Sequence, residues 1–356
     1  MSGIRAFQRE DIPQVVELFG TAFVQSGKSV PPGLDTYFQR VFLENPLSED
    51  DLPSFVYLDA SESIVGFVGV QPKRLLLRGR SLRAAVATKL MVAPAARGSV
   101  AAARLLSRAF AGPQDVLLSD LSNDAGRRIW EALGGVTVLP LSLQWQRPVR
   151  PARHTLSWLR ARGVPGVITR GLRPLSSIAD AVVARFGTGP SRDAFAGYTT
   201  DDLPLDVWVT HLGALCSDRT LRPEYDERSL RWILNVAQRN EPGRPLRRRL
   251  VRDPQGEIVG WFLYYLGPGA ESEVLHLLAR KGAAAAVFDA LLADARSGGT
   301  VMLSGRLEPR MVKEMSERHC YFRHTGHWAL AHSKQPDVLH ALLNGSAFLS
   351  RLEGEW

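Results

Sequence analysis

The segment from Lys89 to Ala102 has the residue types and order of an anion-binding turn. Apolar residues of a strand, Leu90, Met91 and Val92, lead into a turn at Pro94, and an alanine-rich helix follows. The first backbone N–H groups of such a helix have no partner within it, and the helix dipole favours negative charge there. Tight helix–sheet packing is the alternative role. The candidate phosphate site comprises Arg97, Gly98, Ser99, Val100, Ala101 and Ala102.

A second segment with this potential begins at Asn123. Asn123 precedes a helix expected over residues 124–133, and its side chain can cap that helix. The same amide can reach a ligand that lies between the two neighbouring strands. Gly134 and Gly135 end the helix. Each motif is weak alone, but their places in the order of strands favour a binding site.

The first 146 residues alternate strand-like and helix-like patterns that would position these segments. An antiparallel meander is followed by alternating helices and strands, which predicts a mixed sheet with helices on both faces. The expected helices cover residues 10–23, 34–43, the stretch that ends at 110, and 124–133. The expected strands cover residues 4–7, 54–58, 64–77, 82–92, 116–119 and 136–145.

The chain after residue 194 repeats this order faintly. The segments Ser63–Val68 and Glu257–Phe262 both follow a polar turn and both open a long strand. A later strand leads through Arg280 and Gly282 into another alanine-rich helix, and a last strand is expected over residues 321–331. Two copies of one fold are therefore expected. The expected divisions are a domain at 1–146, a basic connector at 147–193 and a second domain at 194–356.

Together these motifs resemble the GNAT acyltransferase superfamily. Its members carry Arg/Gln-x-x-Gly-x-Gly/Ala after a strand and a proline-containing turn, and then Asn-x-x-Ala-x-x-Leu-Tyr-x-x-x-Gly-Phe. Arg97 and Ala102 match the first pattern, with Val100 at the central glycine position. Asn123 matches the second pattern, with Trp130 in place of the tyrosine. The resemblance implies an α/β chain of two GNAT-like domains, the second more divergent, in an arrangement similar to tandem and Fem-type members.

The resemblance also implies that the first half binds acetyl-CoA or another acyl-CoA as co-substrate. The pyrophosphate would lie on the helix after Arg97, and the backbone near Val92 would polarise the thioester oxygen. The tyrosine of the family protonates the leaving thiolate, which Trp130 cannot do because an indole N–H is not acidic in this range. Either another group helps the thiolate leave, or this half is not catalytic. The expected cofactor-binding residues are Leu90, Met91, Val92, Arg97, Gly98, Ser99, Val100, Ala101, Ala102, Asn123 and Trp130.

Acyl transfer to an amine requires a general base beside the acceptor. The resemblance places it near the splayed strand pair around Leu90 and Leu118. Asp120 is the only carboxylate within two residues of either position, so it is the candidate base, directly or through water. The alternative interpretation of Asp120 is a structural one, as an acidic residue at the end of a strand or the entry to a helix. Lys89 is less favoured, because an ammonium must first lose its proton.

Composition narrows the class of protein. The 356 residues include 45% hydrophobic and 22% charged residues, enough for two cores. No apolar run approaches the ~20 residues of a membrane span, and the start resembles no signal peptide, so a cytoplasmic protein is expected. Two cysteines, Cys216 and Cys320, are too few for a disulfide framework. No metal site is expected, since ligand spacing is absent at His319, His324, His327 and His332.

The net charge of +8 is concentrated between Arg147 and Ser177 and at Arg247–Arg249. Such runs either bind an anion or pair with acids on a solvated surface, and the second role is favoured. The leading hypothesis is an N-acyltransferase that moves an acyl group, most simply acetyl, to an unidentified small-molecule amine, in a protein expected to be a monomer. The alternatives are a non-catalytic tandem module and a Fem-like transferase that uses aminoacyl-tRNA. Nucleic acid is the less favoured partner, since no surface of interleaved basic and aromatic residues is evident.

Overall fold

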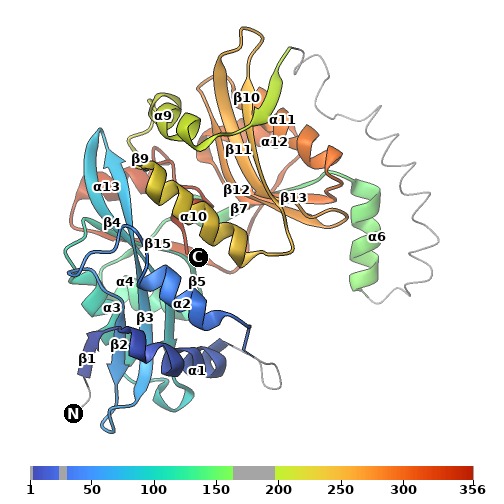
Figure 1. The fold of residues 1–356 in the computed structure, drawn as a ribbon. Coiled ribbons are helices and arrows are strands. Elements are labelled where there is room, and N and C mark those ends of the chain that lie inside the picture. The colour runs from blue at the N-terminus through green and yellow to red at the C-terminus, as the bar shows by residue number, and fades with distance from the viewer. Residues whose placement is uncertain (1–2, 24–29, 163–196, 356) are drawn as a thin grey trace. The chain divides into compact units, whose positions relative to one another are not determined.

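The computed structural model describes residues 3–23, 30–162 and 197–355. The chain forms two compact units, each with its own sheet (Figure 1). Unit 1 comprises Met1–Ser142, Arg219–Ala237 and Gly326–Trp356, and unit 2 comprises Leu143–Asp218 and Gln238–Thr325. The two mixed sheets with helices on both faces that the sequence predicts are confirmed.

The sheet of unit 1 has the order β1-β2-β3-β4-β5-β15-β6, and β9 pairs with β3. Its neighbours are antiparallel except for β4 and β5, which run parallel. The hairpin of β3 and β4 is the longest ladder, which agrees with the long strand expected over residues 64–77. The bounds are β1 Gly3–Ala6, β2 Phe55–Leu58, β3 Ile64–Leu77, β4 Arg80–Val92, β5 Val116–Ser122, β6 Val136–Thr137, β9 Leu221–Pro223 and β15 Trp328–Ser333.

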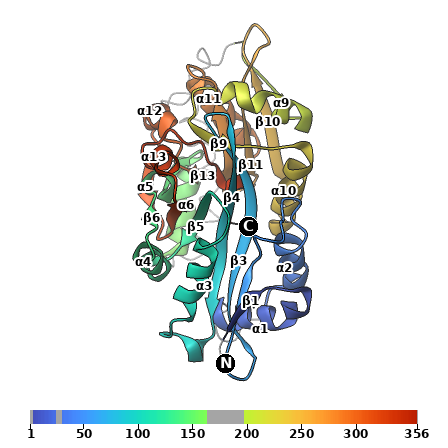
Figure 2. The same ribbon diagram turned by 90° about the vertical axis from the view of Figure 1, so that its left-hand side faces the viewer.

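Helices cover both faces of this sheet. Figure 2 shows α1 (Ile12–Phe23) and α2 (Leu34–Phe42) on one face and α3 (Ala101–Phe110) and α4 (Asp124–Ala132) on the other. The amphipathic α3 buries Leu105 against the sheet, as its helical spacing requires. The remaining helices are α5 Leu139–Ser142, α10 Glu227–Asn240, whose residues to Ala237 belong to unit 1, and α13 Pro336–Leu343. Short 3-10 turns lie at Arg9–Asp11, Pro94–Ala96 and Arg351–Glu353.

The sheet of unit 2 has the order β14-β7-β13-β12-β11-β10-β8, in which β12 and β13 run parallel. Adjacent residues of β11 face opposite helices: Trp261 lies beside Trp208 of α9, whereas Phe262 belongs to the core that α11 covers. The strands are β7 Leu143–Pro148, β8 Thr199–Asp202, β10 Leu246–Arg252, β11 Ile258–Tyr265, β12 Glu271–Ala279, β13 Met302–Arg306 and β14 Tyr321–His324. The helices are α6 Pro151–Ala161, α9 Leu205–Leu215, α11 Ala284–Ser297 and α12 Val312–Glu317, with a 3-10 turn at Pro309–Met311.

The last strand of each expected half belongs to the sheet of the other. β7 pairs with β13 and β14, and β15 pairs with β5 and β6. The single strands expected over residues 136–145 and 321–331 are therefore wrong. The first is interrupted by α5, and the second breaks at Gly326, whose φ is 88°. Beyond each break the chain continues in the other sheet.

This exchange makes the units differ from the contiguous domains 1–146 and 194–356. Arg219–Ala237 and Gly326–Trp356 pack with the N-terminal strands, and the chain from Leu143 packs with unit 2. Most of the connector at 147–193 lies outside the described residues, and its described part includes α6.

The arginine cluster on β10 is matched by acids. Arg247 and Arg249 lie 3.9 and 3.3 Å from Asp294 of α11, and Arg249 also pairs with Asp202. This pairing favours the interpretation of the cluster as a solvated, charge-balanced surface. Among the helices of the described residues, none is long and apolar enough to cross a membrane.

Candidate functional site

Strand β4 carries a bulge where it approaches the end of its parallel neighbour. Phe67 pairs with Met91 and Gly69 pairs with Thr88, so two residues of β4 stand opposite one residue of β3. One of the two is Lys89, whose φ of 51° lies in the left-handed region that non-glycine residues rarely adopt. The bulge thus concentrates backbone strain at one point of the sheet, which is a common feature of functional sites.

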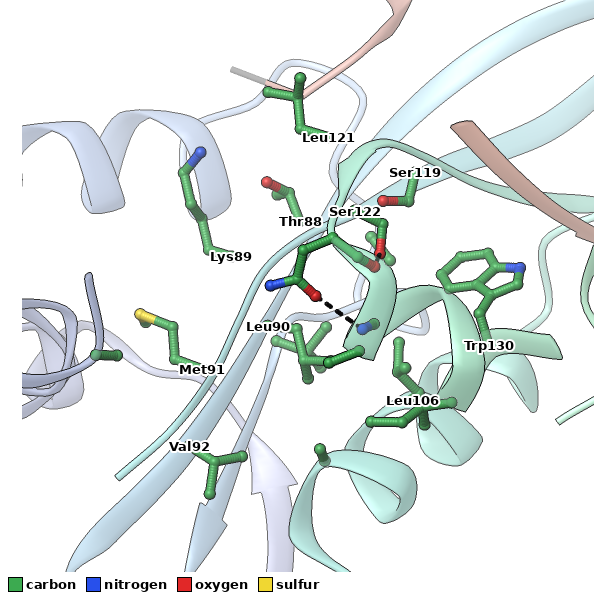
Figure 3. Close-up of a pocket in the computed structure, with 18 of the residues that line it drawn as sticks. Thr88, Lys89, Leu90, Met91, Val92, Leu106, Ser119, Leu121, Ser122 and Trp130 are labelled. Atoms are coloured by element: carbon green, nitrogen blue, oxygen red, sulfur yellow. Dashed lines mark hydrogen bonds between the residues drawn. The ribbon is translucent and has the colours of Figure 1, made fainter. Parts of the chain in front are cut away.

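Beyond this ladder the two parallel strands separate. β4 and β5 pair only where Ala84–Val86 meets Val116–Leu118. The expected splayed pair around Leu90 and Leu118 is therefore present. A cavity of about 510 Å³ occupies the gap (Figure 3). Its walls come from β4 and β5, from α3 and α4 on one face of the sheet, and from the end of α1 on the other.

The cavity unites most of the cofactor-binding residues expected from the sequence. The turn at Gly98, with a φ of 82°, leads into α3 beside the cavity, and Arg97 lies exposed at its edge. Val100 is 58% exposed, so its bulk stays outside the cavity. The expected residues that line it are Leu90, Met91, Val92, Arg97, Ala102, Asn123 and Trp130. Those that form the adjoining turn and helix start are Gly98, Ser99, Val100 and Ala101.

Asn123 and Trp130 line the cavity while serving structural roles. The Asn123 side chain caps α4 by accepting a hydrogen bond of 2.9 Å from the Gly126 backbone N–H. The Trp130 indole is buried, donates to the Ala331 carbonyl oxygen at 3.2 Å, and points its nitrogen away from β4 (Figure 3). A Cβ on Gly135 would lie 1.9 Å from the Trp130 ring. The larger Trp130 therefore fits only because residue 135 has no side chain.

Asp120, the candidate base, is directed at the C-terminal segment. Its carboxylate forms an ion pair with Arg351 and accepts a hydrogen bond of 2.8 Å from the Glu355 backbone N–H. The Asp120 side chain is 7% exposed and the Arg351 side chain 15%. Asp120 does not line the cavity. The geometry therefore gives Asp120 a part in holding the chain terminus.

The Glu355 carboxylate lies at the cavity wall. This residue was not among those that the sequence predicted for the site. One carboxylate oxygen accepts a hydrogen bond of 2.6 Å from the Thr88 hydroxyl. The other accepts one of 2.8 Å from the Ser119 hydroxyl and two longer ones from the backbone N–H groups of Asp120 and Leu121. In the described part of the chain, Glu355 is the only carboxylate that lines the cavity. No local pattern marks it, because 236 residues separate it from Ser119.

A buried polar network holds the segment that carries Glu355. The Glu353 carboxylate accepts hydrogen bonds from the Tyr225 hydroxyl and the Ser350 backbone N–H, and the Lys73 ammonium donates to the Leu352 carbonyl oxygen at 3.3 Å. Burial lowers the pKa of Lys73 to about 8, against the opposing charges of Glu353 and Asp120. Burial likewise raises the pKa of the Glu353 carboxyl.

Gly354 fits the same segment tightly, because a Cβ there would lie 1.9 Å from the Asp120 carboxylate. The C-terminal segment is thus held by the ion pair of Arg351 with Asp120, and it packs closely against Asp120 because Gly354 has no side chain.

The corresponding helices of unit 2 are joined to each other. α11 and α12 follow β12 and β13 as α3 and α4 follow β4 and β5. Arg318, at the end of α12, forms a two-pronged ion pair with Asp289 of α11, with distances of 2.5 and 2.6 Å. Asp289 is buried. In unit 1 the helices α3 and α4 line the cavity. In unit 2 the corresponding helices, α11 and α12, are instead joined by this ion pair.

The histidines near the C-terminus are distributed over both units. His324 lies on β14 in unit 2, whereas His332 lies on β15 in unit 1, stacked 4.2 Å from the Phe110 ring. Burial, with the charge of Lys334, lowers the pKa of His332. Within the residues that the structure describes, no group of three or more potential metal ligands occurs.

Comparison with known proteins agrees with this architecture. Residues 3–115 match the acetyltransferase (GNAT) domain family. None of the curated protein sequences matches the chain closely enough to count as a relative.

Solved structures share the fold over nearly the whole chain at 12% identity. A conserved Enterococcus faecalis protein described as a probable N-acyltransferase has a TM-score of 0.60, with 94% of this chain and 73% of that chain covered. A GCN5-related N-acetyltransferase of Anabaena variabilis has a TM-score of 0.59, with 93% and 72% covered. The N-myristoyltransferase of Saccharomyces cerevisiae, with bound myristoyl-CoA, has a TM-score of 0.51, with 93% and 78% covered.

Proposed function

We propose that the protein is an N-acyltransferase that binds an acyl-CoA in the cavity of unit 1 and transfers the acyl group to an amine. One observation carries the proposal: the gap between β4 and β5 opens at a bulge, and a carboxylate, that of Glu355, lines it. The fold alone would suit a binding module. The carboxylate adds a group that can accept a proton from an amine.

The elements around the cavity suggest how the thioester would lie. The start of α3 and the exposed Arg97 would take the pyrophosphate, since backbone N–H groups and a guanidinium favour an anion. The pantetheine arm would run along Leu90–Val92, toward Thr88. We assign this role to unit 1 alone, because the Arg318–Asp289 ion pair joins α11 and α12, the helices of unit 2 that correspond in order to α3 and α4.

The chemistry requires one bond to form and one to break. The amine nitrogen attacks the thioester carbonyl carbon, the C–N bond forms, and the C–S bond breaks to release the CoA thiolate. Glu355 accepts the proton that the nitrogen loses and passes it to solvent. The thiolate takes a proton from water, because the Trp130 indole N–H is already bound to Ala331.

The chemistry of the cavity lining favours a short acyl group. Thr88, Ser119 and Glu355 form a hydrogen-bonded polar cluster close to the bulge. This cluster is buried, and a long aliphatic chain packed against it would bring apolar atoms to a carboxylate without supplying a hydrogen bond. Acetyl or a similarly short group is therefore the proposed donor.

Acyl-CoA binding should depend on Arg97. Saturating acetyl-CoA at about one hundred times its dissociation constant should raise the unfolding free energy of the wild type by about 2.7 kcal/mol. Arg97→Glu should weaken binding, measured by calorimetry, because it places a carboxylate beside the phosphates. Arg9→Glu, another charge reversal at an exposed arginine, should bind as the wild type does.

These measurements also separate the two classes of function. Tight binding with release of CoA thiol in the presence of amines supports an enzyme. Tight binding without turnover of any amine, or no binding of any acyl-CoA, would support a non-catalytic module instead.

A further inference from the structure

Lys89 faces the cavity because of the bulge. In a regular strand, successive side chains point to opposite faces of the sheet. Here Thr88 stands opposite Gly69, where a Cβ would meet Phe42 of α2. Lys89 lies over the Tyr37 ring of the same helix. The two consecutive side chains therefore face the same side of the sheet, and both line the cavity. The left-handed backbone of Lys89 belongs to the extra residue of the bulge, which re-aims its side chain. A strained backbone thus brings a cationic side chain to the wall that holds Thr88 and Glu355.

The Lys89 ammonium has no anionic partner in the described part of the chain. Its nitrogen lies 5.9 Å from the centre of the Tyr37 ring, and no carboxylate among the described residues forms an ion pair with it. Burial and the negative charge of Glu355 raise the pKa of the Tyr37 phenol, so this ring stays neutral. The ammonium is therefore stabilised by an aromatic face and remains available to an anion.

The charges that line the cavity differ in position. In the described residues they are Arg97, Lys89 and Glu355. Arg97 lies at the turn that opens α3, whereas Lys89 follows directly after Thr88, whose hydroxyl bonds to Glu355. The Glu355 end of the cavity therefore carries one anion and one unpaired cation. This pair complements a molecule with an ammonium and a carboxylate.

We infer that Lys89 binds a carboxylate of a substrate, and this inference rests on the proposed function. The carboxylate has two chemical sources. It belongs either to an acceptor that carries its own carboxylate, as an amino acid does, or to a dicarboxylic acyl group on the donor thioester. In the first case Glu355 takes the amine and Lys89 takes the carboxylate of one molecule. In both cases Lys89 determines specificity and leaves the bond-making step to the amine and Glu355.

Matched substrates isolate the carboxylate. Amino acids are compared with their amides as acceptors, with acetyl-CoA as donor, and succinyl-CoA is compared with butyryl-CoA. Wild type should prefer the carboxylate-bearing member of one comparison by about tenfold to a hundredfold in kcat/KM, the range of a hydrogen bond between charged groups. Lys89→Met should abolish that preference. Its kcat/KM for the neutral member should stay within about threefold of the wild-type value. Lys89→Arg should retain it, and Lys313→Met, at an exposed lysine of unit 2, should match the wild type.

The same set of proteins shows which conclusion fails. Calorimetry with each thioester, and with each amino acid and amide on the CoA-saturated protein, accompanies the kinetics. If wild type binds no acyl-CoA, the proposed function fails. If it binds acyl-CoA but neither binding nor turnover favours a carboxylate, the inference fails and the function stands. An equal loss for both members of each pair in Lys89→Met also overturns the inference, since it would show a role in catalysis or folding.

Discussion

Replacing Glu355 with glutamine should lower kcat for amine acylation by about two to four orders of magnitude, the usual contribution of a general base. Glutamine keeps the size of the side chain and an oxygen that can accept from Thr88 or Ser119, so the local structure should persist. It cannot accept the proton of the attacking amine. Release of CoA thiol measures the rate, and calorimetry should show acyl-CoA affinity within about threefold of the wild type.

The control for this prediction is Glu257→Gln, the same change at an exposed position of unit 2. It should leave both kcat and affinity unchanged. Full activity of Glu355→Gln would mean that the proton leaves by another route. Asp120→Asn would then be the next variant to assay, because Asp120 is the carboxylate that the sequence predicted.

Replacing Arg351 with methionine should lower the free energy of unfolding by about 3–5 kcal/mol if the C-terminal segment stays in place. If the segment detaches locally instead, the loss is limited to the smaller free energy of that local opening. Methionine keeps much of the apolar stem but leaves the buried Asp120 carboxylate without its cationic partner. Urea denaturation measures the loss. Turnover should fall as well, since Asp120 also holds the Glu355 backbone N–H.

A second substitution distinguishes loss of charge pairing from loss of packing. Asp120→Asn combined with Arg351→Met removes both charges, so the double variant should be more stable than Arg351→Met alone. Hydrogen exchange at residues 350–355 would show whether the segment opens locally. An Arg351→Met protein as stable and as active as the wild type would contradict the role given to this ion pair.

Local patterns allowed most of the elements to be predicted from the sequence. The strand at Ile64–Leu77 has the expected bounds because turn residues and an apolar run lie beside one another in the chain. The turn proposed to bind phosphate was likewise visible, since a strand, a turn and a helix start are consecutive. The exchange of β7 and β15 was not visible, because pairing depends on partners far along the chain.

The candidate site divides in the same way. Met91, Arg97 and Asn123 could be predicted because they lie in motifs, but Glu355 could not, since its partners Thr88 and Ser119 lie 267 and 236 residues away. The choice of Asp120 as base followed from its distance along the sequence to the splayed strands. In the structure, the Asp120 carboxylate pairs with Arg351 and accepts a hydrogen bond from the backbone N–H of Glu355. Glu355 is the residue whose carboxylate lines the cavity instead.

Departures from the family pattern also depend on one another. In the sequence, Trp130 and Gly135 are two separate exceptions at the tyrosine and phenylalanine positions. In the structure they form a pair, because the Trp130 ring fills the space in which a side chain at residue 135 would lie. The substitution of the tyrosine therefore removes a proton donor but preserves the packing of α4 on the sheet.

The most direct measurement is a calorimetric titration of acetyl-CoA into the wild type and two tryptophan variants of α3. Ala102 lines the cavity, whereas Ala103, the next residue of the same helix, does not. The wild type and Ala103→Trp should bind acetyl-CoA alike, and Ala102→Trp should show no binding because the indole would take space in the cavity that the cofactor needs. A wild type that does not bind, or an Ala102→Trp variant that binds as tightly as the wild type, would contradict an acyl-CoA site between β4 and β5.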